Sequence, residues 1–233
     1  MRYMSNESKL PVDYALRRSR RKTLAVHVRN QQVEVRAPLF VAAGEIHGFL
    51  LKHLDWIQGK LREQARQADE ALAIRDGGPI FYKARECYLL FQQQSRPGVW
   101  LRGRELCIGG QDLSPARAER IFRDWLMAEA KAYLPRRTEA LVRHLGLESR
   151  FREVVFRKTR SKWGHCTAEG RIQYNWLIML APDAVVDYMI THEVCHLIHM
   201  NHSRDFWQEV ARLCPEHRRY RRWLQDHAHR LWF

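Results

Sequence analysis

The segment His192-Glu193-Val194-Cys195-His196 constrains the fold of this chain more than any other stretch of its sequence. Two histidines four residues apart project from one face of a helix, where both can bind one zinc ion with the glutamate beside them. Pro182 and Asp183 mark the start of such a helix. Apolar residues follow at helical spacing, including Val186, Ile190 and Val194. The pattern predicts a half-buried helix that carries a metal site.

The third metal ligand has two candidates, because a catalytic zinc usually takes three protein ligands and leaves the fourth position for water. His199 shares a helical face with His192, but seven residues of helix would separate their backbones by about 10 Å. His202 would reach the ion if the helix ended near Met200-Asn201, since asparagine tolerates the left-handed conformation that such a turn needs. We therefore predict His202 as the third ligand, beside His192 and His196, and place His199 at the rim.

Further motifs flank this helix. They are Ser161-Lys162-Trp163-Gly164-His165-Cys166, Asn175-Trp176 at the end of a strand, Ala181-Pro182, Asn201-His202-Ser203 and Phe206-Trp207. On these residues the segment from Lys158 to Leu224 resembles the YgjP-like family of predicted zinc metallopeptidases, relatives of the SprT and WLM groups in the zincin superfamily. A weaker resemblance reaches the N-terminal part and so covers most of the chain.

The resemblance implies a zincin-like core in which His192, His196 and His202 bind Zn²⁺ and Glu193 is catalytic. It also implies a substrate cleft, whose candidate contacts are Trp163, His165, Asn175 and Trp176. The chain departs from related patterns at two positions. His199 stands where metzincin proteases have a turn glycine, which argues against a true metzincin. His165 stands where the family usually has serine, and could contact substrate or donate to an oxyanion.

The main functional hypothesis is a zinc metallopeptidase in which Glu193 acts as general base toward a zinc-activated water. A peptide substrate could add as an extra strand at the edge formed by residues 171–178. Candidates for supporting contacts around the metal are Tyr174, Tyr188, His165 and Asp205.

Two alternatives stay open. The same metal site could hydrolyse a nucleotide phosphoanhydride, with the triphosphate held by Arg157, Lys158, Arg160 and Lys162. Alternatively, the chain could be a nucleic-acid-associated protease or binding module. The candidate phosphate contacts are Arg17 to Lys22 and Arg218, Arg219, Arg221 and Arg222.

Composition sets the wider limits. The 233 residues carry a formal net charge of +14, which favours polyanionic partners without identifying one. Neither a run of eighteen apolar residues nor a secretory signal is present, so we expect no membrane span and a cytoplasmic location. The 5 cysteines form no CxxC pair, and we expect reduced thiols instead of disulfides or a thiolate zinc site.

The sequence predicts an α+β fold with a β-rich N-terminal part. Residues 1–76 would form a hairpin and helix region, and residues 77–233 the catalytic domain, although the two could equally make one continuous domain. The expected N-terminal elements are a strand near residues 12–16, a hairpin of residues 23–28 and 33–37, and one helix from Glu45 to about Arg66.

The expected catalytic part begins with two strands at residues 82–91 and 99–108. A helix follows, capped by Ser114, which kinks or restarts at Pro135 and ends at Gly146. Two strands at residues 154–156 and 171–178 and three helices starting near Pro182, Ser203 and Pro215 complete the prediction.

Overall fold

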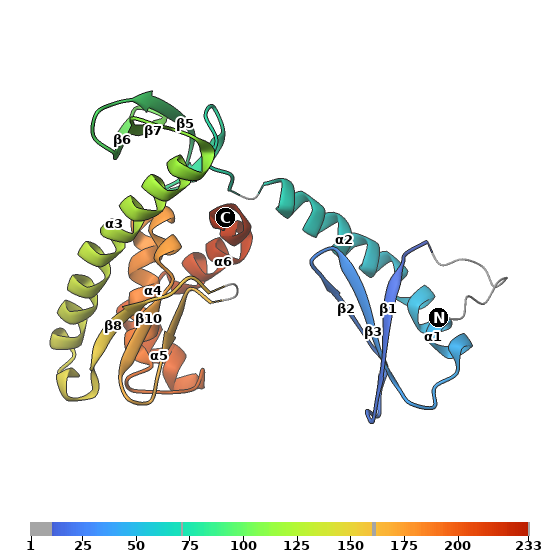
Figure 1. The fold of residues 1–233 in the computed structure, drawn as a ribbon. Helices are drawn as coiled ribbons and strands as arrows, with labels where there is room; N and C mark the ends of the chain where they lie inside the picture. The colour runs from blue at the N-terminus through green and yellow to red at the C-terminus, as the bar shows by residue number, and fades with distance from the viewer. Residues whose placement is uncertain (1–10, 71, 160–161, 233) are drawn as a thin grey trace. The chain divides into compact units, whose positions relative to one another are not determined.

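The computed structural model describes residues 11–70, 72–159 and 162–232. The chain divides into two compact units, residues 1–70 and 71–233, and each is described by itself. This division falls a few residues before the boundary expected at Asp76-Gly77. Both units mix helices with small sheets, so the fold class is α+β as predicted (Figure 1).

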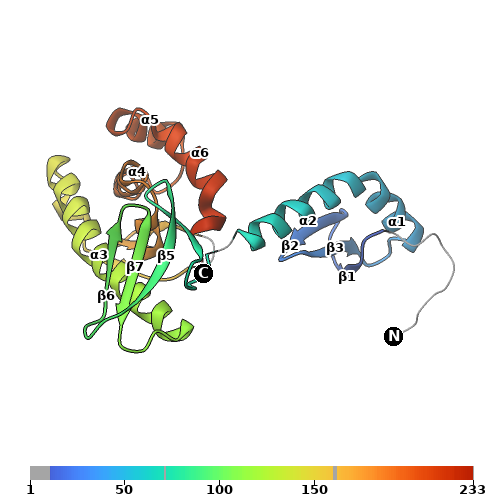
Figure 2. The same ribbon diagram turned by 90° about the horizontal axis from the view of Figure 1, so that it is seen from above.

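The N-terminal unit is a three-stranded sheet covered on one face by two helices (Figure 2). The strands are β1 (Tyr14–Ser19), β2 (Ala25–Arg29) and β3 (Gln32–Pro38), in the order β1-β3-β2. β2 and β3 form the predicted hairpin, closed by Asn30 and Gln31 with φ of 51° and 59°. Alternate residues of β3 face a core that the sheet shares with the helices. Val33, Val35 and Ala37 come from the strand, and Ile46, Leu50 and Ile57 come from the helices.

The single helix expected from Glu45 to Arg66 is in fact two, α1 (Ala43–Lys52) and α2 (Leu54–Asp69). His53 breaks the winding with φ −107° and ψ 9°, and its N–H bonds to Leu50 O at 3.1 Å. Buried residues on both sides of the break face the same core. The apolar spacing therefore continues through a bend that sequence periodicity does not detect.

The second unit begins with a four-stranded sheet of order β4-β5-β7-β6. Its strands are β4 (Pro79–Tyr82), β5 (Arg85–Gln93), β6 (Gly98–Arg102) and β7 (Glu105–Gly110). The predicted strand at 82–91 corresponds mainly to β5, and β4 before it was missed. The predicted strand at 99–108 was wrong, because this stretch folds back on itself at a tight turn between β6 and β7. Lys83 and Ala84 adopt φ of 52° and 62° in the turn between β4 and β5, and Gly103 adopts 62° in the turn between β6 and β7. Lys-Ala is not a usual pair for such a turn.

Helix α3 (Pro115–His144) runs through Pro135 without restarting, and Gly146 follows its end with φ 66°. The predicted cap is also absent, because the Ser114 side chain makes no capping hydrogen bond. Buried residues occur along the whole helix, among them Phe122, Leu134 and Val142. Packing of this face stabilises the helix across the N–H that proline lacks.

A three-stranded sheet follows, made of β8 (Glu153–Phe156), β9 (Gly164–Cys166) and β10 (Arg171–Tyr174) after a short 3-10 turn, η1 (Glu148–Arg150). β10 lies between β8, to which it is parallel, and β9, to which it is antiparallel. The predicted strand at 171–178 is shorter, since η2 (Trp176–Leu180) is a 3-10 helix. β10 is also the central strand, so the predicted place for a peptide was wrong; β8 and β9 are the edge strands.

Three helices complete the unit, as predicted: α4 (Asp183–Cys195), α5 (Arg204–Leu213) and α6 (His217–His227), followed by η3 (Ala228–Leu231). α4 is buried on most sides and joins one core with α3 and the first sheet of this unit. The 5 cysteines are free, and all except Cys214 are buried. Among the described residues, no helix has the length and apolarity that crossing a bilayer requires.

Candidate metal centre

The metal-site helix ends earlier than predicted. α4 stops at Cys195, and the next residues wind more tightly, with Leu197 N–H bonded to Val194 O and Ile198 N–H to Cys195 O, both at 3.0 Å. The left-handed turn expected at Asn201 is absent, because Asn201 is not among the described residues with positive φ.

The Asn201 side chain organises the turn instead. Its Oδ1 accepts a hydrogen bond from the Ser203 N–H at 3.2 Å, and Ser203 Oγ in turn accepts from the Phe206 N–H at 3.3 Å, capping α5. This pair of bonds sets the segment that carries His202.

The three predicted ligands converge. One ring nitrogen from each of His192, His196 and His202 lies within 4.8 Å of the others. Nε2 of His192 is 3.1 Å from Nε2 of His202. Two nitrogens bound at about 2.0–2.1 Å to a tetrahedral ion would lie roughly 3.3–3.4 Å apart. The donor set and its spacing therefore fit one metal ion, and His199 is not part of the cluster.

His199 contributes through its backbone. Its carbonyl oxygen lies 3.0 Å from Nδ1 of His196. If Nδ1 carries the proton, His196 donates to this carbonyl and Nε2 keeps its lone pair for a metal. Nδ1 of His192 is buried and has no hydrogen-bond partner within the described parts of the chain. Burial, followed by the neighbouring His196 and His202, lowers the pKa of His192 to about 3, so its ring is neutral as a ligand must be.

Two aromatic residues of α5 pack the histidines into place. The fully buried ring of Phe206 stacks on His196 at 4.4 Å between centroids and meets His192 and His202 edge-on at 5.0 and 4.9 Å. Trp207 stacks on His202 at 5.6 Å, and the Arg221 guanidinium lies 4.9 Å from the Trp207 ring centroid. The sequence showed this pair only as a motif. The sequence signal that could have identified Phe206 is its position three residues after Ser203, the serine that caps α5.

Glu193 is almost fully buried beside the histidines, with 3% of its surface exposed. Its Oε2 has no hydrogen-bond partner in the described structure. Burial raises the pKa of Glu193 to about 8, partly opposed by Lys162. A cation held by the histidines would lower it again, since a nearby positive charge favours the carboxylate. The orphaned oxygen and the adjacent nitrogens together fit a site built around a cation.

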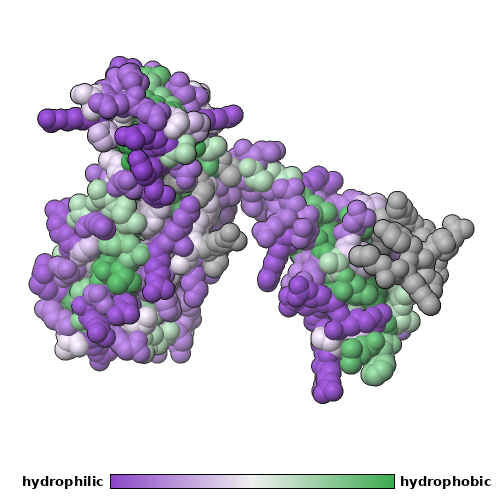
Figure 3. Space-filling model, viewed as in Figure 1, coloured by the Kyte–Doolittle hydropathy of each residue, from purple (hydrophilic) through white to green (hydrophobic). Residues whose placement is uncertain are grey.

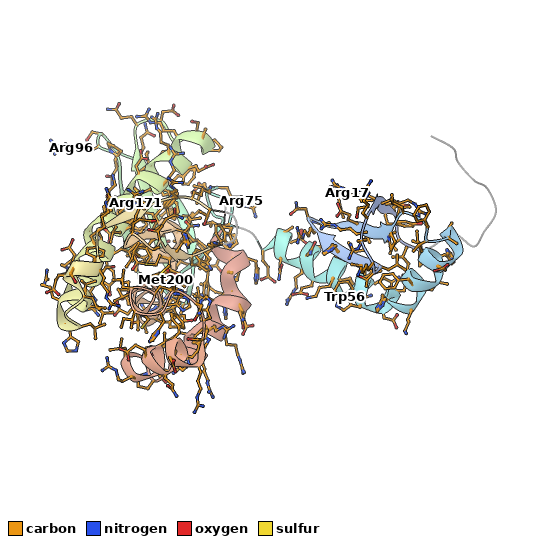
Figure 4. The ribbon with its side chains drawn as sticks, turned by 90° about the horizontal axis from the view of Figure 1, so that it is seen from below. Arg17, Trp56, Arg75, Arg96, Arg171 and Met200 are labelled. Atoms are coloured by element: carbon orange, nitrogen blue, oxygen red, sulfur yellow. The ribbon has the colours of Figure 1, made fainter. Side chains whose placement is uncertain are left out.

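A cleft of about 380 Å³ opens onto Glu193 and the three histidines. Its other lining residues are Lys162, Trp163, Gly164, His165, Cys166, Met189 and Met200. Met200 is 53% exposed at the surface and is labelled in Figure 4. Trp163 and His165, two of the predicted substrate contacts, therefore line the cleft.

Asn175 and Trp176, the other two predicted contacts, do not line this cleft. Both are buried, at 1% and 3% exposure. Asn175 Oδ1 accepts from the Leu177 N–H at 3.2 Å, and its Nδ2 donates to Thr159 O at 3.0 Å. Asn175 therefore caps η2 and, through its bond to Thr159, holds the segment that precedes the cleft residues. Trp176 belongs to the core.

The candidate supporting residues are dispersed. His165 lines the cleft, and Tyr188 meets His192 edge-on at 6.0 Å. Tyr174 lies in the core, its hydroxyl 3.0 Å from Thr138 Oγ1. Asp205 is exposed in the first turn of α5.

Of the described basic residues that could hold a triphosphate, one lines the cleft. Lys162 lines it, whereas Arg157 and Lys158 are not among its lining residues. Arg160, and Ser161 of the motif, lie outside the described residues.

Two helical histidines, a third histidine beyond the helix and a buried glutamate beside a cleft are the elements of a metal-dependent hydrolase. The comparison with protein families agrees. The model described as YgjP-like, metallopeptidase domain, matches residues 22–227, and the chain belongs to this family. No curated protein and no solved structure gives a significant match.

Proposed function

We propose that this protein is a zinc metallopeptidase that cleaves peptides or proteins in the cleft beside α4. The convergence of His192, His196 and His202 next to the buried Glu193 carries the proposal. Membership in a metallopeptidase family favours a peptide bond as the target.

The three histidines would hold the ion. Imidazole donors in a three-ligand set suit zinc and leave a position for water. A zinc ion there supplies Lewis-acid chemistry, lowering the pKa of water and polarising the substrate carbonyl.

Glu193 would act as general base. Its carboxylate takes the proton of the attacking water and later returns it to the leaving amine. The unpartnered Oε2 leaves one oxygen available for that proton, and close packing by β9 keeps the side chain beside the histidines.

The free edge of β9 would orient the substrate. In this antiparallel pair His165 lies opposite Gln173, and the flanking Trp163 and Thr167 are hydrogen-bonded to the β10 side at 2.8 and 2.9 Å. The backbone N–H and C=O groups of Gly164 and Cys166 therefore point away from β10. An extended peptide could bond to them as an added strand, with Trp163 and His165 contacting its side chains.

Nucleotide hydrolysis is the competing function, which Lys162 alone supports among the cleft residues. The decisive experiment compares substrates on one preparation, stripped of metal and reloaded with zinc. We expect cleavage of a quenched-fluorescent peptide library, lost with chelator and in His192→Ala. Release of phosphate or pyrophosphate from nucleoside triphosphates, without peptide cleavage, would replace the peptidase assignment. The cytoplasmic location expected from the sequence is part of the same proposal, and fractionation of cells tests it.

A further inference from the structure

The N-terminal unit has one sheet face that its own helices leave uncovered. Val33, Val35 and Ala37 face α1 and α2 and are at most 4% exposed. The residues between them, Glu34 and Arg36, face the other side because successive side chains of a strand alternate.

The neighbouring strands add arginines to this open face. Arg17 of β1 pairs with Arg36, His27 of β2 with Glu34, and Arg29 with Gln32. Paired residues share a face of the sheet, so the open face carries Arg17, His27, Arg29 and Arg36, which we call the basic sheet face.

The pairing of positive charges on adjacent strands destabilises the folded sheet. Like charges in register on adjacent strands repel and destabilise a sheet. The single carboxylate of the face, Glu34, lies between Arg17 and Arg36 at 3.0 and 2.6 Å and compensates part of that repulsion. Arg17 nevertheless keeps 73% of its side chain exposed. One acid among three arginines leaves the face positive.

Positive charge continues past the end of β1, where Arg20, Arg21 and Lys22 form the connection to β2. Nε of Arg21 is buried without a hydrogen-bond partner within the described chain. Arg18 is different, because its guanidinium donates to three backbone carbonyls, those of Pro38, Leu39 and Val41, at 2.8–3.2 Å. Arg18 therefore holds the chain after β3 and is not available to a partner.

Apart from Glu34 and the exposed Asp13 just before β1, the acidic side chains of the unit lie mostly on the helices. Glu45, Asp55 and Asp69 lie on the helices. Figure 4 shows Arg17 and the half-exposed Trp56 on opposite sides of the unit. Membrane docking inserts apolar side chains together with basic ones. On the strands, the basic sheet face offers only the small apolar residues Ala15, Ala25 and Pro38, although the exposed Leu39 and Phe40 directly follow β3.

We propose that the basic sheet face binds the phosphodiester backbone of nucleic acid without reading its sequence. Regularly spaced arginines on a surface free of acidic excess complement a chain of phosphates. The inference does not depend on peptidase activity, since it concerns a different unit of the chain.

Salt dependence and matched variants test the proposal on the full-length protein. Fluorescence anisotropy with labelled 20-nucleotide single-stranded DNA, single-stranded RNA and duplex DNA should show binding that weakens with salt. With four or five phosphate contacts, the loss between 50 and 200 mM salt should be roughly 50- to 130-fold for the single strands and roughly 150- to 500-fold for the duplex. The combined variant Arg17→Gln, Arg20→Gln, Arg29→Gln should bind at least tenfold more weakly, with a salt slope lower by about 1 per residue removed.

The control carries the same charge change on the helices: Lys52→Gln, Arg62→Gln, Arg66→Gln. It should bind as the parent does, and circular dichroism should show both variants folded. Equal weakening in the control would mean that total charge acts, which overturns the proposal. So would the lack of oligonucleotide binding at 50 mM salt. Binding to phosphatidylserine vesicles or to polyglutamate, with none to oligonucleotides, would also overturn it by assigning the face to a membrane or an acidic protein.

Discussion

A Cβ atom on Gly164 would lie 2.6 Å from Cδ of Glu193, closer than side-chain carbons approach one another. The β9 backbone thus packs directly against the carboxyl group, and any side chain at position 164 would displace it. The close contact is therefore the reason that position 164 requires glycine. Backbone conformation is not the reason, since Gly164 is not among the residues with positive φ.

Gly164→Ala should therefore impair catalysis while leaving the metal ligands in place. A displacement of a catalytic group by about 1 Å can cost on the order of a hundredfold in rate, and we expect a loss of at least that size in kcat with one metal ion per chain retained. The measurement is peptide turnover beside elemental analysis. The matched control is Gly98→Ala, where a Cβ meets nothing within 4 Å; equal activity of the two variants would contradict the close packing.

His202 and His199 can be separated by metal content. His202→Ala removes one of the three clustered nitrogens, and the zinc bound after dialysis should fall well below one ion per chain. His199→Ala keeps the backbone carbonyl that contacts His196, so its zinc content should match the parent. Elemental analysis of both variants measures the zinc content. If His202→Ala kept its zinc and His199→Ala lost it, His202 would not be a ligand.

Glu193→Gln should separate metal binding from turnover. Glutamine keeps the side-chain shape and cannot take a proton, and Glu193 is not one of the clustered ligands. We expect unchanged zinc content and a turnover lower by about a hundredfold to ten-thousandfold. Parent-level peptide cleavage by the zinc-loaded variant would show that another group is the base.

The metal-free protein should lose stability as the pH rises from 7 to 8. Burial raises the pKa of Glu193 to about 8 from 4.5, so in this range the folded chain binds a proton that the unfolded chain has lost. The free energy of unfolding then falls with pH, by at most about 1.4 kcal/mol per unit. His192, whose pKa is lowered to about 3 from 6.5, is neutral in the folded chain but still partly protonated in the unfolded chain near pH 7, so it opposes this slope at the low end of the range and contributes little near pH 8.

Urea unfolding in chelator at several pH values checks this dependence. The Glu193→Gln variant, which cannot ionise, is the control and should give a flatter profile. A parent profile as flat as the variant's would show that the carboxyl group is not protonated in the folded chain.

Local spacing explains which parts of the site the sequence predicted. His192 and His196 share a helical face whatever the rest of the chain does, and Asn201-Ser203 is a turn signal that brings His202 back. Trp163 and His165 followed from the family motif. Asn175 belonged to the same motif, yet it is buried as a cap of η2. A motif marks residues the fold needs without saying which of them touch a substrate.

The unpredicted features depend on contacts between distant segments. Glu193 and Gly164 meet only because β9 pairs with β10 above α4, and no local pattern encodes that approach. Other features were missed for a local reason. The bend at His53 preserves the apolar spacing of the two helices, and the turns at Lys83-Ala84 and Gly103 interrupt stretches whose composition is β-rich throughout. Periodicity reports which residues are buried, but it does not report where a strand folds back.

The early end of α4 has a consequence for how the protein is assembled. His192 and His196 are positioned by one helix, but His202 depends on the Asn201 turn and on α5, whose Phe206 packs against all three rings. The three-histidine cluster is therefore completed only when α5 docks. An ion held there would link two segments that are otherwise joined by a short irregular connection, and we expect metal loading to slow proteolysis of that connection as it stabilises the folded chain.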